Sequence, residues 1–352
     1  MASFNPSNVN LDTASKEQVL CYLAISENDY NGHLGARISS IFVILFVSTA
    51  FTFFPVVAKR IPGWKIPHNA YLFARYFGTG VIVATAFIHL LDPAYKRIGP
   101  SSCVGNSGHW ADYSWCAAIV LASVVVIFLM DLAAEVYVEH KYGLERDDSA
   151  TNAFITSHQD HMGPFNQATT IPTRTKSNDN MAEGSINAER SFQQQIAAFL
   201  ILEFGIIFHS VIIGLNLGVT GDEFATLYPV LVFHQSFEGL GIGARMSAIP
   251  FGRHKWLPWV LCLAYGLTTP VSIAIGLGVR TTYNPGSKTA MIVQGVLDAV
   301  SAGILIYSGL VELLARDFLF DPCRTKRRTQ LLYMVVCVLL GAGIMALIGK
   351  WA

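Results

Sequence analysis

The sequence predicts an all-α polytopic membrane protein with about eight transmembrane helices. Hydrophobic residues make up 52% of the 352 residues and charged residues 14%, whereas soluble domains carry about 25% charged residues. Apolar runs of roughly 20 residues, long enough to cross a bilayer core, recur along the chain. Helices are the structure that such runs adopt in lipid, because a helix satisfies its own backbone hydrogen bonds.

The predicted membrane helices form two groups, three before a long polar segment and five after it. Some contain Gly or Pro, such as Pro55, Gly78 and Pro270, which are ordinary in membrane helices and let neighbours approach closely. The segments are 38–58, 70–92 and 114–138, then 196–219, 224–248, 256–279, 289–314 and 330–349.

The two polar parts of the chain carry no membrane segment. Residues 1–37 are polar and mixed in charge, with no pattern of a secretory signal, so the first membrane helix is expected to direct insertion. Residues 140–193 are rich in Asn, Thr, Ser, Asp and Gln and lack apolar periodicity. This composition is typical of a disordered linker.

The distribution of Lys and Arg predicts the orientation. Basic residues concentrate in the loops after the first, fifth and seventh segments, which share one side, and cytosolic loops carry such an excess. Both termini, including residues 1–37, are therefore predicted outside and the 140–193 linker in the cytosol. The basic residues are Lys59, Arg60, Lys65, Arg253, Lys255, Arg316, Arg324, Lys326, Arg327 and Arg328.

The six cysteines show no CxxC spacing, which argues against a zinc finger or a thioredoxin-like motif. Cys103 and Cys116 lie in the loop after the second segment, which is predicted outside and therefore permits disulfides. We expect a bridge between these two residues, with Cys21 as a competing partner.

Three ionisable residues lie inside the fourth and fifth predicted helices, at a similar membrane depth. His209 is in the fourth helix, and His234 and Glu238 are in the fifth. The spacing of His234 and Glu238, i and i+4, places them on one helix face. Ser210 and Gln235 are adjacent candidates for secondary ligands.

A charge at the centre of a bilayer costs roughly 2.5–3.5 kcal/mol, so a ligand or partner normally compensates it. Two imidazoles and one carboxylate suit a borderline metal such as Zn²⁺. With these three ligands a bound divalent ion keeps about one positive charge. The site can therefore be occupied without binding the ion too tightly to release it. The alternative is a structural network in which Glu238 bonds a histidine and locks two helices together.

Further polar residues lie toward the two membrane surfaces. His89 and Asp92, at i and i+3 near the outer end of the second helix, are candidates for an entrance, or are interfacial residues before a Pro-containing turn. Acidic residues toward the cytosolic side are candidates for an exit path, and helix capping and ion pairing explain them equally well. The exit candidates are Glu135, Glu139 and Glu312, with Asp131 and Glu203 nearby.

His158 and His161 in the linker, in the run SHQDHMG, are candidates for weak metal binding. Scattered histidines are also common in disordered loops. Asp298, in the seventh helix, has no predicted role.

Two motifs carry a family resemblance. HSVIIGLNLG in the fourth helix and HQSFEGLGIG in the fifth resemble the paired signature helices of the ZIP family of zinc and iron transporters. ATAFIHLL in the second helix and LVELL in the seventh are similar as well. An aliphatic residue before the glycine of HSVIIG resembles the fungal and plant branch, which includes plasma-membrane zinc and iron importers.

The resemblance implies a metal site between the fourth and fifth helices, and alternating access by movement of one helical block against the other. His209, His234 and Glu238 fall on the main site, and Ser210, Gln235 and Glu238 on a second. Many relatives have carboxylates where Ile213, Gln235 and Thr269 stand here, so we expect one main site.

These observations predict a plasma-membrane importer that moves Zn²⁺ to the cytosol as its substrate. The alternatives are an importer that prefers Fe²⁺ or takes a broader range of divalent metals, an intramembrane zinc hydrolase, and a metal sensor with a transporter fold. The expected partners are the metal ion and the lipid bilayer, with a homodimer left open. The net charge of zero gives no indication of nucleic acid binding.

Overall fold

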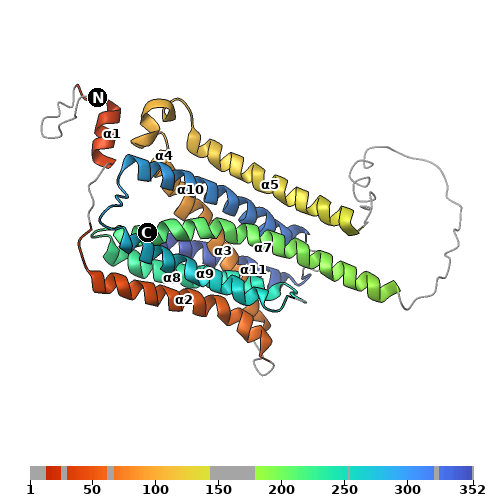
Figure 1. Ribbon diagram of the computed structural model, residues 1–352. Coiled ribbons are helices and arrows are strands. Elements are labelled where there is room, and N and C mark those ends of the chain that lie inside the picture. Colours follow the sequence, from red (N-terminus) through yellow and green to blue (C-terminus); the bar gives the residue numbers. More distant parts are fainter. Residues whose placement is uncertain are drawn as a thin grey trace, which may run out of the picture.

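The structure, a computed structural model, describes residues 13–24, 30–61, 67–142, 179–252, 254–320 and 325–350. Within these ranges the regular elements are helices and no strand occurs, so the predicted all-α class is confirmed. Figure 1 shows the long helices lying side by side in one bundle. We call the end of the bundle near α1 the α1 end, and the end where α5 finishes and α7 starts the linker end.

Two of the long helices change their winding part of the way along. α3 continues through the π-helical segment η2 into α4, and α10 continues into the π-helical segment η6. Short turns η3 (Val104–Asn106) and η4 (Gly108–Trp110) connect α4 to α5. The helices are α1 (Lys16–Ala24), α2 (Leu34–Arg60), α3 (His68–Ala84), η2 (Thr85–Leu91), α4 (Asp92–Ile98), α5 (Trp115–Tyr142), α7 (Asp179–Val219), α8 (Phe224–Ala248), α9 (Leu257–Gly278), α10 (Lys288–Tyr307), η6 (Ser308–Phe320) and α11 (Arg328–Ile348).

Among the described residues, seven helices are long and apolar enough to cross a membrane. They correspond to seven of the eight segments predicted from the sequence. The remaining segment is α8, which has 25 residues but carries His234, Gln235, Glu238 and Arg245 among its apolar residues. It packs against α2 and α3 within the bundle, so we keep eight spans as the prediction.

The outer surface of the bundle is apolar. Leu121, Val126 and Leu129 of α5 and Leu332 and Leu339 of α11 are all exposed. Exposed apolar surface on this scale marks contact with a partner or a membrane. Together with the lengths of the helices, it identifies a polytopic membrane protein whose lipid-facing side chains are in contact with hydrocarbon.

The structure describes helices inside both ends of the 140–193 segment, which the sequence predicts as a disordered linker. α5 extends to Tyr142, and α7 already begins at Asp179. Phe192 explains part of the difference, because its ring stacks on His254 at 5.7 Å and meets Phe251 edge-on at 5.8 Å. These contacts hold the first half of α7 against the connection between α8 and α9. His158 and His161 lie outside the described residues.

The expected Cys103–Cys116 bridge is wrong, and the competing partner forms the bond. Cys21 is joined to Cys103, with 4.4 Å between their Cα atoms. α1 packs on η3 and brings Cys21 to this position. Cys116, in the first turn of α5, is a free thiol buried among Ala94, Ile98 and Val104.

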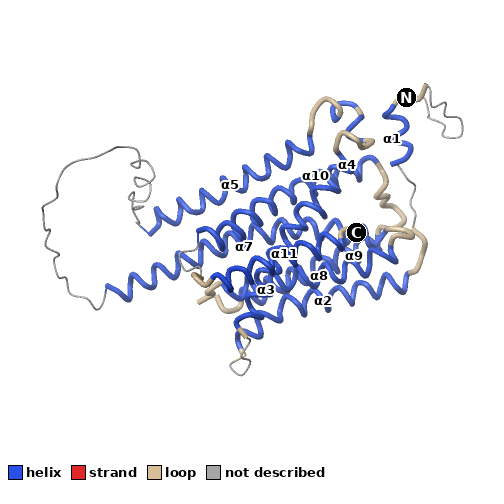
Figure 2. Tube along the Cα trace, turned by 180° about the vertical axis from the view of Figure 1, so that it is seen from behind, coloured by secondary structure: helices blue, strands red, loops and turns tan. Residues whose placement is uncertain are grey.

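The helices pack as two blocks. In the first block α2 packs on α8 and α9, and α7 packs on α9. In the second block α3 packs on α11, and α10 packs on α4 and α5. The blocks meet where α3 lies against α8 and α10 lies against α7. Figure 2 shows the same arrangement from behind, with α5 and α10 at one side of the bundle and α2 at the other.

Two glycines allow a close approach between the blocks. Gly78 of α3 faces Gly241 of α8, and a Cβ atom added to Gly241 would lie only 2.6 Å from the Cα atom of Gly78. Small residues let the backbones of membrane helices come this close.

Arg37 of α2 ties the first block together at the α1 end. Its buried guanidinium donates hydrogen bonds to the carbonyl oxygens of Leu217 (3.1 Å) and Thr220 (2.5 Å). It also lies over the rings of Tyr30 and Phe224. The last carbonyls of a helix have no partner within the helix, so Arg37 supplies donors that α7 lacks.

Replacing Arg37 by Met is expected to destabilise the protein by about 3 kcal/mol, because buried carbonyls lose charged donors. The measurement is the midpoint of thermal unfolding in detergent. Lys288→Met removes an exposed cation near the same end of the bundle and is the matched control. Equal midpoints for the two variants would contradict the capping role.

Candidate metal centre

The structure brings His209, His234 and Glu238 together in the middle of the bundle. The Nε2 atoms of the two histidines are 3.2 Å apart, and Nε2 of His234 is 3.5 Å from Oε2 of Glu238. One ligand atom from each residue fits within a group no more than 4.8 Å across. Two nitrogens held at about 2.0–2.1 Å by one tetrahedral Zn²⁺ are roughly 3.3 Å apart, so the observed separation fits a shared ion.

The local helical geometry produces this arrangement. α7 and α8 run in opposite directions and are joined by a short turn, so residues near their centres meet at one depth. His234 and Glu238 are one helical turn apart on α8 and face α7 together. The exposed fractions of His209, His234 and Glu238 are 3%, 1% and 0%, so water does not solvate these side chains.

Several polar atoms of this group have no hydrogen-bond partner. Both carboxylate oxygens of Glu238, Nδ1 of His234 and the hydroxyl of Ser210 are buried and make no hydrogen bond within the described residues. Buried polar atoms are normally paired, and unpaired ones call for an explanation such as a missing ion. A bound cation supplies a partner for the carboxylate. This observation favours a metal site over the alternative of a helix-locking network.

His89, one of the entrance candidates, lies next to this group. Its ring meets the ring of His234 at 4.9 Å, and its Nε2 donates to the carbonyl of Met345 at 3.2 Å. Because the carbonyl only accepts, Nε2 carries the hydrogen and Nδ1 keeps the lone pair. His89 belongs to the second block, so it approaches the centre from the opposite side to α7.

Asp92 does not join His89. It is exposed and pairs with Lys96 at 2.7 Å. The predicted entrance pair relied on an α-helical i and i+3 spacing, but His89 lies in the π-helical segment η2. The wider turn of a π-helix moves residues three apart onto different faces. Asp92 therefore remains a surface carboxylate at the α1 end.

Gln235 is occupied by neighbours from α9. Its amide nitrogen donates to Oγ1 of Thr269 at 2.7 Å, and its amide oxygen accepts from the Tyr265 hydroxyl at 2.8 Å. Gln235 and Thr269 are two of the positions at which many relatives carry a carboxylate. In this structure they form a hydrogen bond with each other next to the His209, His234 and Glu238 group. One N–H of the amide and its oxygen are therefore already used by residues of α9.

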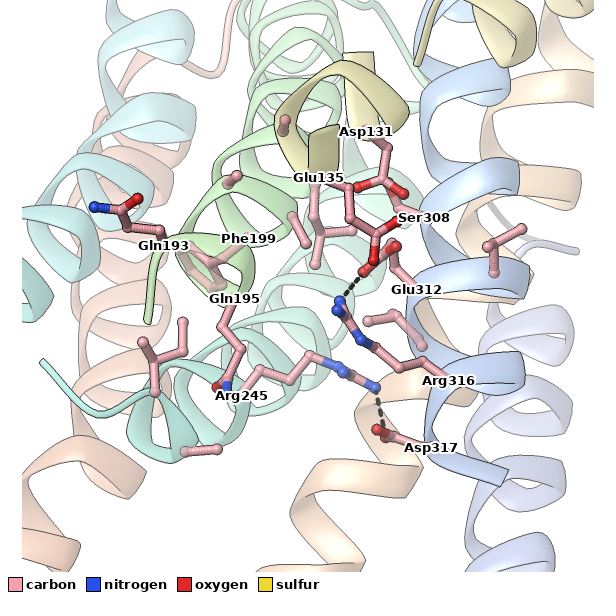
Figure 3. A pocket seen from close by; sticks show the side chains of 18 of the residues that line it. Asp131, Glu135, Gln193, Gln195, Phe199, Arg245, Ser308, Glu312, Arg316 and Asp317 are labelled. Atoms are coloured by element: carbon pink, nitrogen blue, oxygen red, sulfur yellow. Dashed lines mark hydrogen bonds and ion pairs between the residues drawn. The ribbon is translucent and has the colours of Figure 1, made fainter. Parts of the chain in front are cut away.

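A cavity of about 910 Å³ opens at the linker end. Figure 3 shows carboxylates of α5 and η6 pointing into it, including the exit candidates Glu135 and Glu312. Glu312 pairs with Arg316, and Asp131 accepts from the Tyr307 hydroxyl at 2.9 Å. Glu139 lies in α5, but its side chain is outside the described part of the structure.

An ion-pair network at the cavity was not predicted from the sequence. Asp317 pairs with Arg75 at 2.7 Å and with Arg245 at 3.4 Å, and Arg245 also donates to Thr79 at 2.6 Å. The sequence did contain a signal, because Arg245 is seven residues after Glu238 and so lies on the same face two turns further along α8. Arg75 and Arg245 both line the cavity.

Asp298, which had no predicted role, has a cationic partner. It is buried in α10 and pairs with Arg97 of α4 at 2.5 Å. The pair holds two parts of the second block together near the α1 end.

Comparison with known proteins gives consistent matches over almost the whole chain. The family model described as ZIP Zinc transporter matches residues 34–349. Zinc-regulated transporter 1 of Saccharomyces cerevisiae is 57% identical, covering 99% of this chain and 97% of the relative. Zinc-regulated transporter 1 of Schizosaccharomyces pombe is 41% identical, over 98% and 92%. Zinc transporter 9 of Oryza sativa subsp. japonica is 34% identical, over 90% and 89%. The matched residues include every helix from α2 to α11.

Proposed function

The chain belongs to the ZIP family of zinc transporters, and on this premise we propose that it imports Zn²⁺ across the plasma membrane into the cytosol. The transported ion binds between α7 and α8, at His209, His234 and Glu238. The relatives that carry the name zinc-regulated transporter support zinc as the substrate. Membership of a transporter family also argues against the intramembrane hydrolase.

The observation that carries the proposal is the buried carboxylate of Glu238, which accepts no hydrogen bond among the described residues, beside two imidazoles inside the bundle. A divalent ion bound there keeps about one uncompensated positive charge, so binding is favourable but reversible. A carrier needs both properties, since it must release what it takes up.

Alternating access is the proposed mechanism. The three ligands all belong to the first block, whereas His89 approaches from the second block. Movement of the first block past the second would carry the ligands between the two membrane faces. In this structure Ile206, Ile242 and Met246 are buried on the linker side of the site, so the way to the cavity is closed by packed side chains.

The direction of transport depends on the orientation of the bundle. We expect tags at residue 2 and residue 352 to be reachable by antibody from outside intact cells, and a tag near Asn178 to be reached after permeabilisation alone. The basis is the excess of Lys and Arg in the loops on the linker side. Antibody labelling of the tag near Asn178 in intact cells would reverse the orientation and exclude import.

Metal selectivity is tested by competition. Purified protein in liposomes should accumulate tracer zinc, and unlabelled Zn²⁺ should compete better than Fe²⁺ or Mn²⁺. Stronger competition by Fe²⁺ would favour the iron-preferring alternative, and equal competition the broader one. A protein that binds zinc without any accumulation would instead be a sensor. A homodimer is a further hypothesis, which light scattering of the detergent-purified protein tests.

A further inference from the structure

Glu203 of α7 is a carboxyl group buried in the apolar core of the bundle. Its exposed fraction is 4%, and neither oxygen has a hydrogen-bond partner among the described residues. Its neighbours along α7, Phe199, Leu202 and Ile206, belong to the largest hydrophobic cluster. An ionisable residue inside the membrane is costly and is retained where it serves a function, and no packing contact of this carboxyl group explains it.

Two buried sulfur atoms belong to the same hydrophobic cluster as the α7 neighbours of Glu203. Sγ of Cys262 is 3.4 Å from Sδ of Met246, and both residues are fully buried. Glu203 lies within electrostatic range of the Cys262 thiol and of the Tyr265 hydroxyl. A carboxylate on α7, a thiol on α9 and a thioether on α8 are therefore all buried in this part of the bundle, and the two sulfur atoms are in contact. Sulfur donors suit soft and borderline metals, including zinc.

The three residues occupy one layer between the central site and the cavity. With a rise of about 1.5 Å per residue, Glu203 is about 9 Å from His209 toward the linker end, and Met246 is about 12 Å from Glu238 in the same direction. On α9, Cys262 is about 10 Å from Thr269, which bonds Gln235 beside the centre. The next residues outward along α7, Leu202 and Phe199, already line the cavity.

We propose that Glu203, Cys262 and Met246 form a second, inner binding position for the transported ion. The proposal rests on the proposed transport function. The ion leaves the central site, is held briefly by the Glu203 carboxylate and the two sulfur atoms, and then reaches the acidic cavity. A single negative charge again leaves about one positive charge on a divalent ion, so this position releases it as readily as the first.

The first test separates transport from binding. Glu203→Gln keeps the shape and removes the charge, so the maximal rate of zinc uptake in liposomes should fall about tenfold with little change in the half-saturating concentration. Glu203→Asp should recover part of the rate. The zinc affinity of the central site, measured by equilibrium binding in detergent, should remain near that of the parent protein. An unchanged maximal rate in Glu203→Gln contradicts the proposal.

The second test measures the ratio of Cd²⁺ to Zn²⁺ uptake, which should not change if Cys262 and Met246 only pack in the core. Cys262→Ser and Met246→Leu should each lower the ratio of Cd²⁺ to Zn²⁺ uptake by about threefold or more, because a soft ion loses a sulfur donor. Cys337→Ser, which alters a buried cysteine packed between Leu72 and Met334 of another cluster, is the control and should leave the ratio unchanged.

The outcomes distinguish this proposal from the proposed function. If the parent protein takes up no zinc, the transport function itself is wrong. If the parent transports but both sulfur variants keep the parent ratio, the inner position is wrong and the central site stands. Should Glu203→Gln fail to give monodisperse protein, the ratio measured on the two sulfur variants decides.

Discussion

Glu238→Gln is expected to reduce zinc uptake by roughly a hundredfold, on the scale of the 2.5–3.5 kcal/mol that an uncompensated charge costs in a membrane. The amide keeps the shape of the side chain but removes the single formal negative charge of the three ligands. A divalent ion would then be held by neutral groups in surroundings of low dielectric constant, where charge interactions are strong. His209→Ala and His234→Ala should each weaken uptake less, because the carboxylate remains.

The measurement is uptake against zinc concentration at matched surface expression. Glu223→Gln removes an exposed carboxylate just before α8 and is the matched control, with uptake expected near that of the parent. Near-normal uptake by Glu238→Gln would refute the site between α7 and α8, whatever family the chain belongs to.

Gly241→Val should also have a large effect, by a different mechanism. Its Cβ atom alone would lie 2.6 Å from the Cα atom of Gly78, and that backbone can yield only if α3 and α8 separate. Overpacking of this kind typically costs about 1–3 kcal/mol, and more where backbones are in contact. We expect the yield of folded protein to fall strongly, and zinc uptake of the remainder to fall about tenfold or more, because this contact lies between the two blocks.

The matched control is Gly343→Val in α11, where an added Cβ atom meets no other atom within 4 Å. This change carries the same cost of a β-branched residue in a helix without the interhelical contact. Yield by size-exclusion chromatography and uptake in liposomes are compared for the two variants. If both behave like the parent protein, close packing of α3 on α8 is not required.

The sequence predicted most of the bundle because the bilayer restricts what an apolar run of this length can form. The lengths and order of the long helices follow from that restriction. The position of His209 relative to His234 and Glu238 was predictable for a related reason, since polar residues at a common depth of antiparallel helices must be near one another. The metal-binding role of these residues remains a prediction.

Other features depend on contacts that no local pattern encodes. The pairing of His89 with the centre requires the π-helical winding of η2, which the apolar run around it does not signal. The hydrogen bonds of Gln235 depend on Thr269 and Tyr265 of a helix that follows much later in the chain. The pairing of Cys21 with Cys103 in the disulfide likewise depends on how α1 packs on η3. The spacing of the cysteines in the sequence left that pairing open.

The disulfide has a consequence for the range of motion of the protein. Cys103 fixes α1 to the second block, whereas Asn31 is hydrogen-bonded to Asp222 at 2.8 Å, between α7 and α8 of the first block. The backbone between Ala24 and Asn31 therefore joins the two blocks as a covalent tether of seven residue steps. Fully extended, such a tether spans at most about 25 Å. While the disulfide and the Asn31 anchor both hold, this length sets an upper limit on how far these two anchor points can move apart, and reduction of the disulfide removes the limit.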